Sequence, residues 1–574
     1  LGFNFKITDN LKLDFAYAPH FWEQHYKGYQ TELPTYYPDE SLAYSVPNAT
    51  SLTHKNNRYK KNNIKATLHY DNKFGDHGVG LLAGWQDEDY WERWFSGSRR
   101  GFDLPGYDVL DAGAKDEQKA EGTGSEWALR SFFGRINYNY KERYLFEANI
   151  RYDGSSRFAK GHRWGLFPSF SGGWRISEEA FWEPLRSTFD NFKIRASWGQ
   201  LGNQNIGTYP FDSFVNLALP YVFNSSPYNG AALQAMANNR ISWEKTEMTN
   251  FGVDFTLFKN LQVTFDYYIK NTSDILLTLD VPKIIGLTAP YQNAGKVRNK
   301  GWELALNYGD KVNDFSYNIG FNLSDVKNKV IDLKGINSAD LVVNHEGYSM
   351  NSIYALEAIG FFTSEDQLNN HAKQYGNYSL GDIMYKDQLT IDTDGDGIPD
   401  EADGVINDDD KVIVGNSIPR FTFGLSTYLS WKNFDFNMLL QGVGKADGYL
   451  YSQAVMPFYL GGTATEGHKD YWSEDNPNAT YPRLAFNEPN NEKHSTFWMK
   501  NAAYLRVKNV QIGYNIPKKI LQNCGIQSTR IYVSGQNLFS FDSFWDGFDV
   551  ESAVGRGNHY PQVRSFSVGL DVKF

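Results

Sequence analysis

The sequence predicts an all-β protein, a transmembrane antiparallel β-barrel to which the whole chain, residues 1–574, contributes. Three observations predict this class. Apolar and polar residues alternate in many segments, aromatic residues are abundant although no long apolar run exists, and short turns alternate with long polar excursions. Each observation follows from the way in which tilted strands cross a bilayer.

The last strand shows the alternation most clearly. In the closing segment RSFSVGLDVKF, apolar side chains fall on one face of an extended strand, and small or polar ones fall on the other. The apolar face consists of Phe566, Val568, Leu570, Val572 and Phe574. A strand that ends on an aromatic residue in this way is typical of the closing strand of an outer-membrane barrel, and a strand of a soluble β-sandwich is the alternative.

The same alternation recurs along the chain. Residues 251–270 read FGVDFTLFKNLQVTFDYYIK, which predicts two paired strands around a tight turn. Predicted strands of roughly 9–13 residues have the length needed to cross a bilayer at a tilt. We expect nine representative residues to face lipid and their i+1 neighbours to face the lumen. The nine are Phe251, Val253, Leu261, Val263, Leu304, Ile319, Phe423, Val568 and Leu570.

Composition supports a barrel and excludes other classes. Aromatic residues make up 16% of the chain, and many stand at predicted strand ends, where the aromatic girdles of a membrane barrel lie. The mean hydropathy is −0.53, and no segment approaches the ~18 consecutive apolar residues of a membrane helix. The net charge of −11 lacks the excess of basic residues that is typical of nucleic-acid-binding proteins. The one cysteine, Cys524, excludes an internal disulfide.

Loop lengths predict the orientation, because outer-membrane barrels have short periplasmic turns and long extracellular loops. Short turns are predicted at residues 8–10, 141–143, 258–260 and 431–433. Long excursions are predicted near residues 19–58, 87–126, 203–240, 271–296, 325–417 and 443–499. Because these excursions far exceed the usual connection length, we expect a partner or a ligand to order them.

The strand count predicts a barrel larger than this chain. Counting hairpins back from Phe574 gives roughly seventeen strands, whereas a single-chain bacterial barrel has an even number. We therefore expect earlier strands to precede Leu1. A large strand number with many long loops favours a plugged transporter of about 22 strands over a porin.

Several segments carry a specific pattern in a fixed order. The longest, residues 131–182, reads SFFGRINYNYKERYLFEANIRYDGSSRFAKGHRWGLFPSFSGGWRISEEAFW. The others are FKIRASWGQLGNQNIGTYPF (192–211), WEKTEMTNFGVDF (243–255), NAGKVRNKGWELAL (293–306), YWSEDNPNATYPR (471–483), NAAYLRVKNVQIGYNIPKK (501–519) and RIYVSGQNLF (530–539). Over nearly its whole length, the chain resembles the SusC/RagA-type TonB-dependent transporters of Bacteroidetes outer membranes.

The resemblance implies the C-terminal part of a plugged barrel, energised by the TonB complex through an N-terminal region that this sequence lacks. It also implies a SusD-like surface lipoprotein that acts as a lid over the extracellular loops. The implied activity is import of nutrient oligomers, with oligosaccharides as the first choice and glycan uptake as the role. Oligopeptides are the second choice, and siderophore or haem is the third. A passive porin and a soluble β-rich binding or adhesion protein are alternatives from other classes.

Arginines gather around the segment RYDGSSRF. Asp153 and Gly154 predict a tight turn that needs a positive φ at the end of a strand. The arginines are Arg151, Arg157, Arg163 and Arg175. They are candidates to bind an anionic ligand or lipopolysaccharide phosphates, and the alternative is ion pairing with Glu147 and Asp153 along the wall.

A second chemical pattern is the acidic segment IDTDGDGIPDEADG, residues 391–404. Its predicted Ca²⁺ ligands, at loop positions 1, 3, 5, 7, 9 and 12, are Asp392, Asp394, Asp396, the carbonyl of Ile398, Asp400 and Asp403. Aspartate replaces the usual bidentate glutamate at position 12, and the alternatives are a looser site or a ligand supplied by Asp408 or Asp410. No amphipathic helices flank the segment, which predicts an EF-like calcium loop rather than an EF-hand. We expect the ion to have a structural role only. A solvated acidic loop without metal is the alternative.

The sequence carries no enzyme signature, and we expect no catalysis. The eleven histidines form no HExxH pair, and Cys524 falls in a predicted periplasmic turn. Exposed aromatic residues of the predicted loops are the candidate substrate contacts, because a ring face stacks on the apolar face of a sugar. They are Trp91, Trp94, Phe95, Tyr221 and Tyr228. Packing against the lid protein is the alternative role of these rings.

Overall fold

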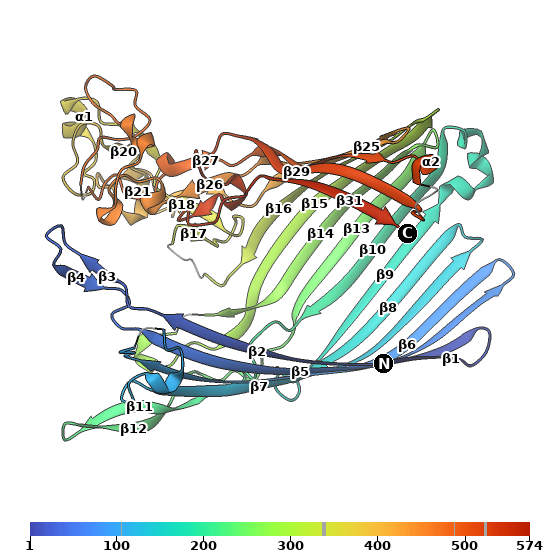
Figure 1. Cartoon of the computed structure of the whole chain (residues 1–574), viewed down its shortest axis with the longest axis horizontal. Helices are drawn as coiled ribbons and strands as arrows, with labels where there is room; N and C mark the ends of the chain where they lie inside the picture. Colours follow the sequence, from blue (N-terminus) through green and yellow to red (C-terminus); the bar gives the residue numbers. More distant parts are fainter. Residues whose placement is uncertain (105, 280, 336–339, 487, 522–524) are drawn as a thin grey trace. The chain divides into compact units, whose positions relative to one another are not determined.

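The computed structural model describes residues 1–574 except 105, 280, 336–339, 487 and 522–524 (Figure 1). Cys524, which the sequence places in a periplasmic turn, lies outside the described residues. The chain divides into two compact units, which we describe in turn. Unit 1 comprises Leu1–Trp174, Ser197–Met248 and Thr272–Gly295, and unit 2 comprises Arg175–Ala196, Thr249–Asn271 and Lys296–Phe574.

Strands dominate the described part of the chain, where seventeen of them belong to one sheet. The count of roughly seventeen strands is therefore confirmed. Among the described residues, no helix has the length and apolarity needed to span a membrane. The α-helices are α1 (Glu365–Asn370) and α2 (Lys518–Leu521). The 3-10 turns are Leu110–Ala112, Ile176–Glu178, Ala180–Leu185, Lys283–Ile285, Asp408–Asp410, Ser452–Ala454, Tyr459–Gly461, Glu466–Lys469, Thr496–Trp498 and Val550–Ser552.

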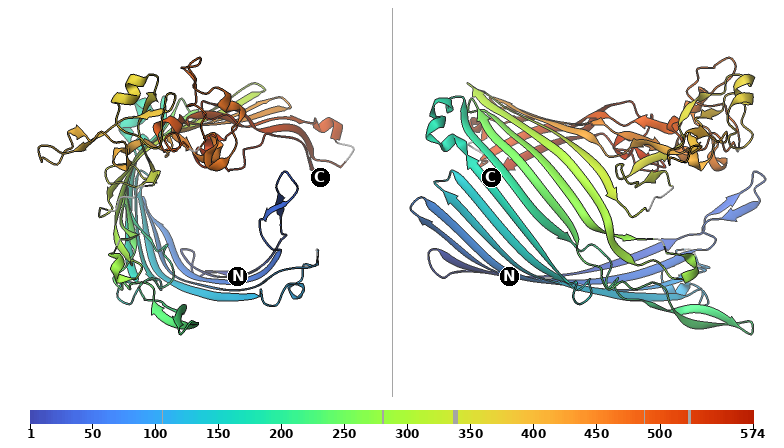
Figure 2. Two further views of the ribbon diagram at one scale, coloured as in Figure 1. Left: turned by 90° about the vertical axis from the view of Figure 1, so that its left-hand side faces the viewer. Right: turned by 180° about the vertical axis from the view of Figure 1, so that it is seen from behind.

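Unit 1 contains a run of long antiparallel strands that pair in the order β1–β2–β5–β6–β7–β8–β9. Residues pair one to one along this run without a register shift. Two hairpins, β3–β4 and β11–β12, extend beyond the ends of the long strands (Figure 2). The bounds are β1 (Gly2–Lys6), β2 (Leu11–Gln30), β3 (Pro34–Tyr36), β4 (Leu42–Ser45), β5 (Ser51–Phe74), β6 (His77–Arg100), β7 (Lys119–Tyr140), β8 (Tyr144–Ser155), β9 (Trp164–Arg175), β11 (Val215–Phe223) and β12 (Ser226–Leu233).

Unit 2 repeats the antiparallel pattern in the order β15–β16–β24–β25–β28–β29–β31. Five strands have residues in both units: β9, whose last residue is Arg175, β10 (Phe189–Asn203), β13 (Glu244–Leu257), β14 (Leu261–Thr278) and β15 (Tyr291–Val312). The other long strands are β16 (Phe315–Asp332), β24 (Arg420–Trp431), β25 (Phe434–Lys445), β28 (Tyr504–Asn515), β29 (Ser528–Asp542) and β31 (Ser565–Lys573). Short strands in the loops are β17 (Val342–Val343), β18 (Ser352–Ala355), β19 (Ala358–Phe361), β20 (Ile383–Tyr385), β21 (Leu389–Ile391), β22 (Glu401–Ala402), β23 (Val412–Asn416), β26 (Asp447–Leu450), β27 (Met499–Asn501) and β30 (Val554–Gly555).

The short turns lie where the sequence predicts them. β7 ends at Tyr140 and β8 begins at Tyr144, and the amide of Arg143 donates to the Tyr140 carbonyl at 3.0 Å. The turn residues Lys141 and Glu142 have φ values of 54° and 55°. Two consecutive left-handed residues give a turn whose twist matches that of the flanking strands. The turn therefore fixes the register of the β7–β8 pair.

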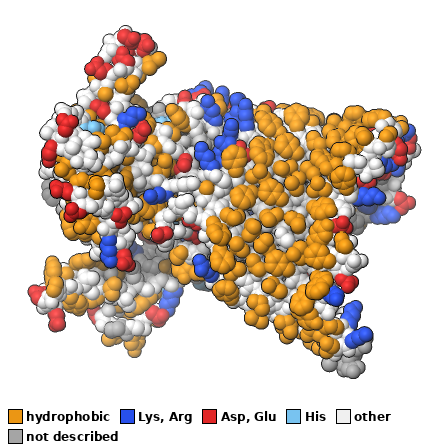
Figure 3. All heavy atoms as spheres, turned by 90° about the horizontal axis from the view of Figure 1, so that it is seen from above, with side chains coloured by type: hydrophobic (Ala, Val, Ile, Leu, Met, Phe, Trp, Pro, Cys, Tyr) orange, Lys and Arg blue, Asp and Glu red, His pale blue; other side chains and the backbone are white. Residues whose placement is uncertain are grey.

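The apolar rows are exposed rather than packed into a core. On β31, the exposed fractions are 74% for Phe566, 78% for Val568 and 62% for Leu570. None of the nine residues expected to face lipid belongs to a hydrophobic core in the described part of the chain. Val263 is nevertheless buried, on the same face of β14 as Leu261 and Phe265. Figure 3 shows hydrophobic side chains as a broad field over the strands, with acidic side chains gathered elsewhere.

Two rows of stacked aromatic rings cross β7, β8 and β9 on this apolar face. The first row, at the short turns, is Tyr140, Tyr144 and Trp174, and the second is Phe132, Tyr152 and Trp164. From Tyr144 to Tyr152 the strand rises about 27 Å, which after tilting fits the apolar band of an outer-membrane barrel. The rows are the interfacial girdles that the composition predicts.

Several strands are longer than expected. β5 and β6 each span 24 residues, and the excursions expected at residues 19–58 and 87–126 shrink to residues 31–50 and 101–118. The sequence prediction ends each strand where apolar alternation ends. Backbone pairing continues beyond that point, because the ladder hydrogen bonds do not depend on which side chains the strand carries. The strands therefore extend past the apolar band, and there both faces carry polar residues together with aromatic rings.

The two longest loops of unit 2 form a hydrophobic core of their own. Buried side chains of both loops pack together around Trp498, which is 1% exposed, and Phe544 and Val550 of the loop after β29 join the same core. A buried polar network also joins the loops: Gln374 donates to the Asn490 side chain at 2.9 Å, and Asn491 donates to Asp382 at 2.7 Å. These loops thus bury part of their apolar surface against each other. That a partner or a ligand helps to order the long excursions stays a prediction.

Candidate functional site

The polar face of unit 1 carries a continuous row of aromatic rings. Trp22 on β2 stacks on Tyr59 of β5, with ring centroids 4.7 Å apart and planes 12° apart. Tyr90 on β6 stacks on Trp127 of β7 at 5.7 Å and 22°. Tyr59 and Tyr90 lie 6.5 Å apart and join the two pairs. The row therefore crosses four adjacent strands.

The register places this row on the face opposite the apolar rows. Leu81 and Tyr90 lie on β6 at positions of opposite parity, and no register shift intervenes. Leu81 is exposed among the apolar side chains of its face. In an outer-membrane barrel, the face opposite the lipid-facing one lines the lumen. The rings are thus candidates to contact a solute in the lumen.

Charged and amide groups border the row on the same face. Lys61 forms an ion pair with Glu88 at 2.9 Å, and Asn63 donates to Glu88 at 3.1 Å. The Arg157 guanidinium lies 5.2 Å from the centre of the Trp127 ring. Apolar ring edges beside carboxylate, amide and cationic groups match a ligand that has both apolar surface and hydrogen-bonding groups.

The structure separates the five candidate substrate residues. Trp91, Trp94 and Phe95 lie on strand β6 rather than in a loop. Trp94 points to the polar face, where Lys55 lies 4.1 Å from its ring centre, whereas alternation places Trp91 and Phe95 on the opposite face. Tyr221 and Tyr228 pair across hairpin β11–β12 and are exposed.

Sequence reasoning did not find the aromatic row. Trp22 falls within a predicted loop, and the partners of each ring come from strands that lie far apart in the sequence. The alternation of each strand carries part of the signal, but only the pairing register brings the four rings together.

The arginines around residue 154 do not form one cluster. Arg151 pairs with Asp153 at 2.8 Å, and Arg175 pairs with Glu178 at 3.3 Å. The wall ion pair that is the alternative for Arg151 is therefore the observed arrangement. The turn predicted at Asp153 and Gly154 is wrong, because β8 continues to Ser155. Glycine is needed at 154 for close packing, since a Cβ there would lie 2.7 Å from the Trp164 ring.

Ion pairs line the polar face of unit 2. Arg195 on β10 bonds both Asp254 of β13 at 3.0 Å and Asp266 of β14 at 2.6 Å. Arg530 on β29 pairs with Asp435 of β25 at 2.5 Å. A guanidinium that bridges carboxylates from different strands is satisfied in a fixed geometry. These groups hold the wall rather than present free charge.

The acidic loop joins strands β21 and β22, which pair with each other. The carboxylates of Asp392, Asp394 and Asp396 are exposed, and their oxygens come within 4.8 Å of one another. The amides of Gly397 and Gly395 donate to Asp392 at 2.8 and 2.7 Å. Gly397 has a φ of 87°, the left-handed conformation that position 6 of such a loop requires.

The other predicted ligands lie outside this cluster of three. Asp400 accepts from the hydroxyl and amide of Thr393 at 2.7 and 3.0 Å, and Asp403 follows β22 and accepts from the amide of Val405. The Gly397 amide lowers the pKa of Asp392, and the Thr393 hydroxyl lowers the pKa of Asp400. Both carboxylates are therefore ionised at neutral pH, the state in which they bind a cation.

Comparison with known proteins defines the class of the chain. The family described as "TonB dependent receptor-like, beta-barrel" matches residues 1–538. The chain belongs to this family of outer-membrane β-barrel receptors, which are not enzymes. The expected SusC/RagA-type resemblance and outer-membrane location are thereby confirmed.

Individual relatives support the same class. The chain is 31% identical over 538 residues to TonB-dependent receptor P3 of Formosa agariphila, covering 88% of this chain and 52% of the relative. It is 28% identical over 538 residues to TonB-dependent receptor SusC of Bacteroides thetaiotaomicron, covering 90% of this chain and 50% of the relative. The chain thus spans about half the length of the curated relatives it matches.

The solved structure of the RagAB peptide transporter shares the fold. It matches with a TM-score of 0.83 at 22% identity, over 100% of this chain and 61% of that chain. The likeness at this identity concerns the fold alone.

Proposed function

We propose that the protein imports oligosaccharides across the outer membrane, energised by TonB and capped by a SusD-like surface lipoprotein. Membership of the TonB-dependent receptor family supports the energy source, and the SusC relative supports the lid. Oligopeptide import is the second candidate, because a protein of the same fold is a peptide transporter.

The observation that carries the proposal is the aromatic row on the polar face of unit 1. A sugar ring offers apolar C–H groups together with hydroxyls, and it binds best where aromatic surface lies beside polar groups. Trp22 is 38% exposed at one end of the row, and the Lys61–Glu88 pair stands beside the rings. The row would let a chain of sugars move from ring to ring along the wall.

The exposed hairpins of unit 1 are the contacts that we propose for the lid. Tyr221, Phe223 and Tyr228 on β11–β12 are each about three-fifths exposed, at 63%, 61% and 59%. A two-stranded hairpin alone is marginally stable in water, so exposed rings on it favour a protein partner. The loops near residues 87–126, 325–417 and 443–499 are further proposed contacts, and the last two share a hydrophobic core.

Replacing the row should abolish oligomer uptake. In the full-length receptor, Tyr59→Ala/Tyr90→Ala removes the centre of the row, and we expect uptake of labelled oligosaccharides to fall at least tenfold while growth on monomers is unchanged. The matched control is Lys60→Ala/Trp91→Ala, since these sequence neighbours lie on the opposite face. Uptake by whole cells is measured against a panel of oligosaccharides of defined linkage and oligopeptide mixtures.

The outcomes separate the candidates. Loss of peptide uptake alone would replace oligosaccharide with oligopeptide as the substrate class. Equal uptake by the row variant and the control would remove the row from the transport path. Free ion conductance by the purified receptor without TonB would favour a porin.

We propose further that the acidic loop binds Ca²⁺ through Asp392, Asp394, Asp396 and Asp400, with the Ile398 carbonyl and Asp403 as further ligands. The ion would neutralise carboxylates that otherwise repel one another and so hold the loop in one shape. It would have a structural role only.

Calorimetric titration with Ca²⁺ tests this site, after a chelator has removed bound metal from the purified receptor. We expect Asp394→Ala/Asp396→Ala to abolish the binding heat, because two of the three clustered carboxylates are lost. Asp366→Ala, in the exposed helix α1 of the same loop, is the control and should titrate like the parent. An unchanged titration of the double variant would leave the loop as a solvated acidic turn.

A further inference from the structure

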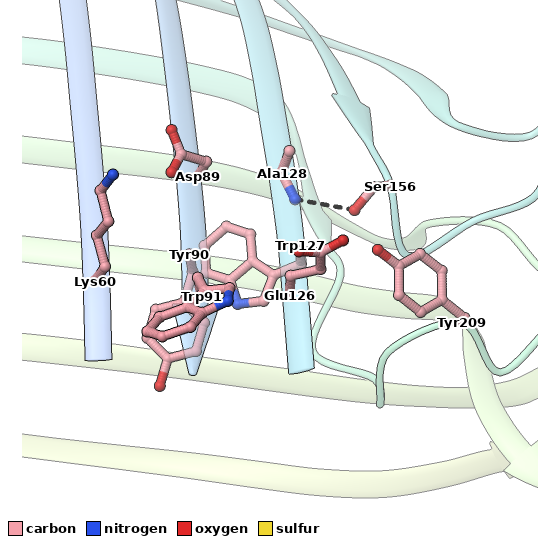
Figure 4. A pocket seen from close by; sticks show the side chains of 9 residues that line it. All are labelled: Lys60, Asp89, Tyr90, Trp91, Glu126, Trp127, Ala128, Ser156 and Tyr209. Carbon is pink, nitrogen blue, oxygen red and sulfur yellow. Dashed lines mark hydrogen bonds between the residues drawn. The ribbon is translucent and has the colours of Figure 1, made fainter. Parts of the chain in front are cut away.

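Three adjoining cavities form a groove on the apolar side of unit 1, above its apolar band. The central cavity, of about 570 Å³, is lined by Lys60, Asp89, Trp91, Glu126 and Tyr209, among others (Figure 4). A cavity of about 400 Å³ shares Asp89, Ala128 and Ser156 with it. A third, of about 460 Å³, shares Trp91 and adds Arg58, Arg93 and Phe95.

The groove is hollow because small residues occupy its floor. Gly122, Gly124 and Ala128 alternate on this face of β7. A Cβ at Gly124 would lie 2.8 Å from the Arg93 side chain, and one at Gly122 would lie 2.8 Å from the Trp94 carbonyl oxygen. The glycines therefore let the arginine of β6 lie close over β7.

The register places the groove outside the barrel wall. Lys60, Trp91 and Glu126 are directly paired neighbours on β5, β6 and β7. They share a face with the exposed Leu68, Leu81 and Ile136, as alternation without a register shift requires. The face is thus the one turned toward lipid, and a transported solute in the lumen does not reach it.

The groove also lies at a defined height above the apolar band of the strands. The apolar band ends where Trp85 pairs with Phe132, and two residues further Asp87 pairs with Arg130 through bonds of 2.8 and 2.7 Å. Asp89 and Trp91 lie about 7 and 13 Å beyond Asp87 along the strand. This is the level at which the phosphorylated core sugars of outer-leaflet glycolipids lie above the acyl chains.

The lining matches such a headgroup. Arg93 lies 5.1 Å from the centre of the Trp91 ring, and Lys60 lies 5.7 Å from that of Phe21, so the two cations rest on apolar rings. Lysine and arginine bind phosphate, arginine through its planar fork. Trp91 supplies a ring for a sugar, and Asp89, Glu126 and the Tyr209 hydroxyl supply partners for its hydroxyls.

We propose that this groove binds the phosphorylated core oligosaccharide of lipopolysaccharide. The proposal requires only the outer-membrane location and not the transport function. It gives the long extensions of β5, β6 and β7 a role, since they carry the groove above the bilayer.

Two double variants of the full-length receptor test the proposal. Lys60→Ala/Trp91→Ala removes a cation and a ring from the groove, and the control Lys61→Ala/Tyr59→Ala removes a cation and a ring from the opposite face of β5. Affinity in detergent micelles is measured for lipopolysaccharide with a complete core, for lipid A without core sugars, and for inorganic phosphate. We expect the first variant to weaken binding of complete lipopolysaccharide at least tenfold and the second to change it less than twofold.

Lipid A or inorganic phosphate binding as tightly as complete lipopolysaccharide would overturn the proposal, and so would equal loss of affinity in both double variants. Unchanged lipopolysaccharide affinity with loss of a copurifying lipoprotein would assign the groove to a protein partner instead. Heat-modifiable gel migration checks folding, and the milder Lys60→Gln and Trp91→Phe variants replace any double variant that does not fold.

Discussion

Arginine in place of Val568 should destabilise the folded receptor by about 2–4 kcal/mol. Val568 is 78% exposed on the apolar face of β31 and pairs with Val533. It lies six residues before Phe574, about 20 Å along the strand, which at the tilt of a barrel strand is close to half the height of the apolar band. A guanidinium there meets hydrocarbon, in which its charge is poorly solvated.

Equilibrium unfolding of the full-length receptor from phospholipid vesicles measures this cost. Ser567→Arg is the control, because Ser567 lies on the polar face of the same strand, and we expect less than 1 kcal/mol for a change that leaves the charge in water. Equal costs for the two variants would mean that the exposed row does not face lipid.

Alanine in place of Trp498 should destabilise the loop layer of unit 2 by about 3–5 kcal/mol, because it empties the centre of a packed core. The side chain is 1% exposed, its Nε1–H donates to the Asn491 carbonyl at 3.1 Å, and its ring meets Phe497 edge-on at 4.8 Å. We expect the loops to open while the strands stay folded, since backbone pairing holds the strands independently.

Limited proteolysis with mass spectrometry reports the opening of the loops. When the cleavage rate follows the fraction of molecules with opened loops, a destabilisation of the loop layer by about 3 kcal/mol should raise that rate at least 100-fold. Leu389→Ala, which truncates a 57% exposed side chain in the same loops, should leave the cleavage rate nearly unchanged. A parent-like rate in Trp498→Ala would show that the loops do not depend on this core.

The stability of the loop layer bears on the lid. Loops that order each other present a fixed surface, so a lid protein would bind a prepared site and lose little ordering entropy on binding. If a partner instead had to fold the loops, as loop length alone predicts, the lid would lose more ordering entropy on binding and would bind more weakly for the same contacts. The Trp498 variant therefore also tests whether copurification of a lid depends on loop order.

By itself, the sequence determined what depends on neighbours in the chain. The alternation in residues 565–573 fixes a strand and its two faces, because side chains of an extended chain alternate locally. The tight turn at residues 141–143 follows from its length and its flanking strands. Class, membrane location and the direction of most apolar side chains were predictable for this reason, as was the row of carboxylates at Asp392, Asp394 and Asp396.

Only the tertiary structure decided what depends on partners distant in the sequence. The register of β2, β5, β6 and β7 brings Trp22, Tyr59, Tyr90 and Trp127 into one row. The core around Trp498 joins loops separated by a pair of strands. The strand ends beyond the apolar band could not be predicted either, because backbone pairing continues there without the alternation of apolar and polar residues that marks a strand in a single segment.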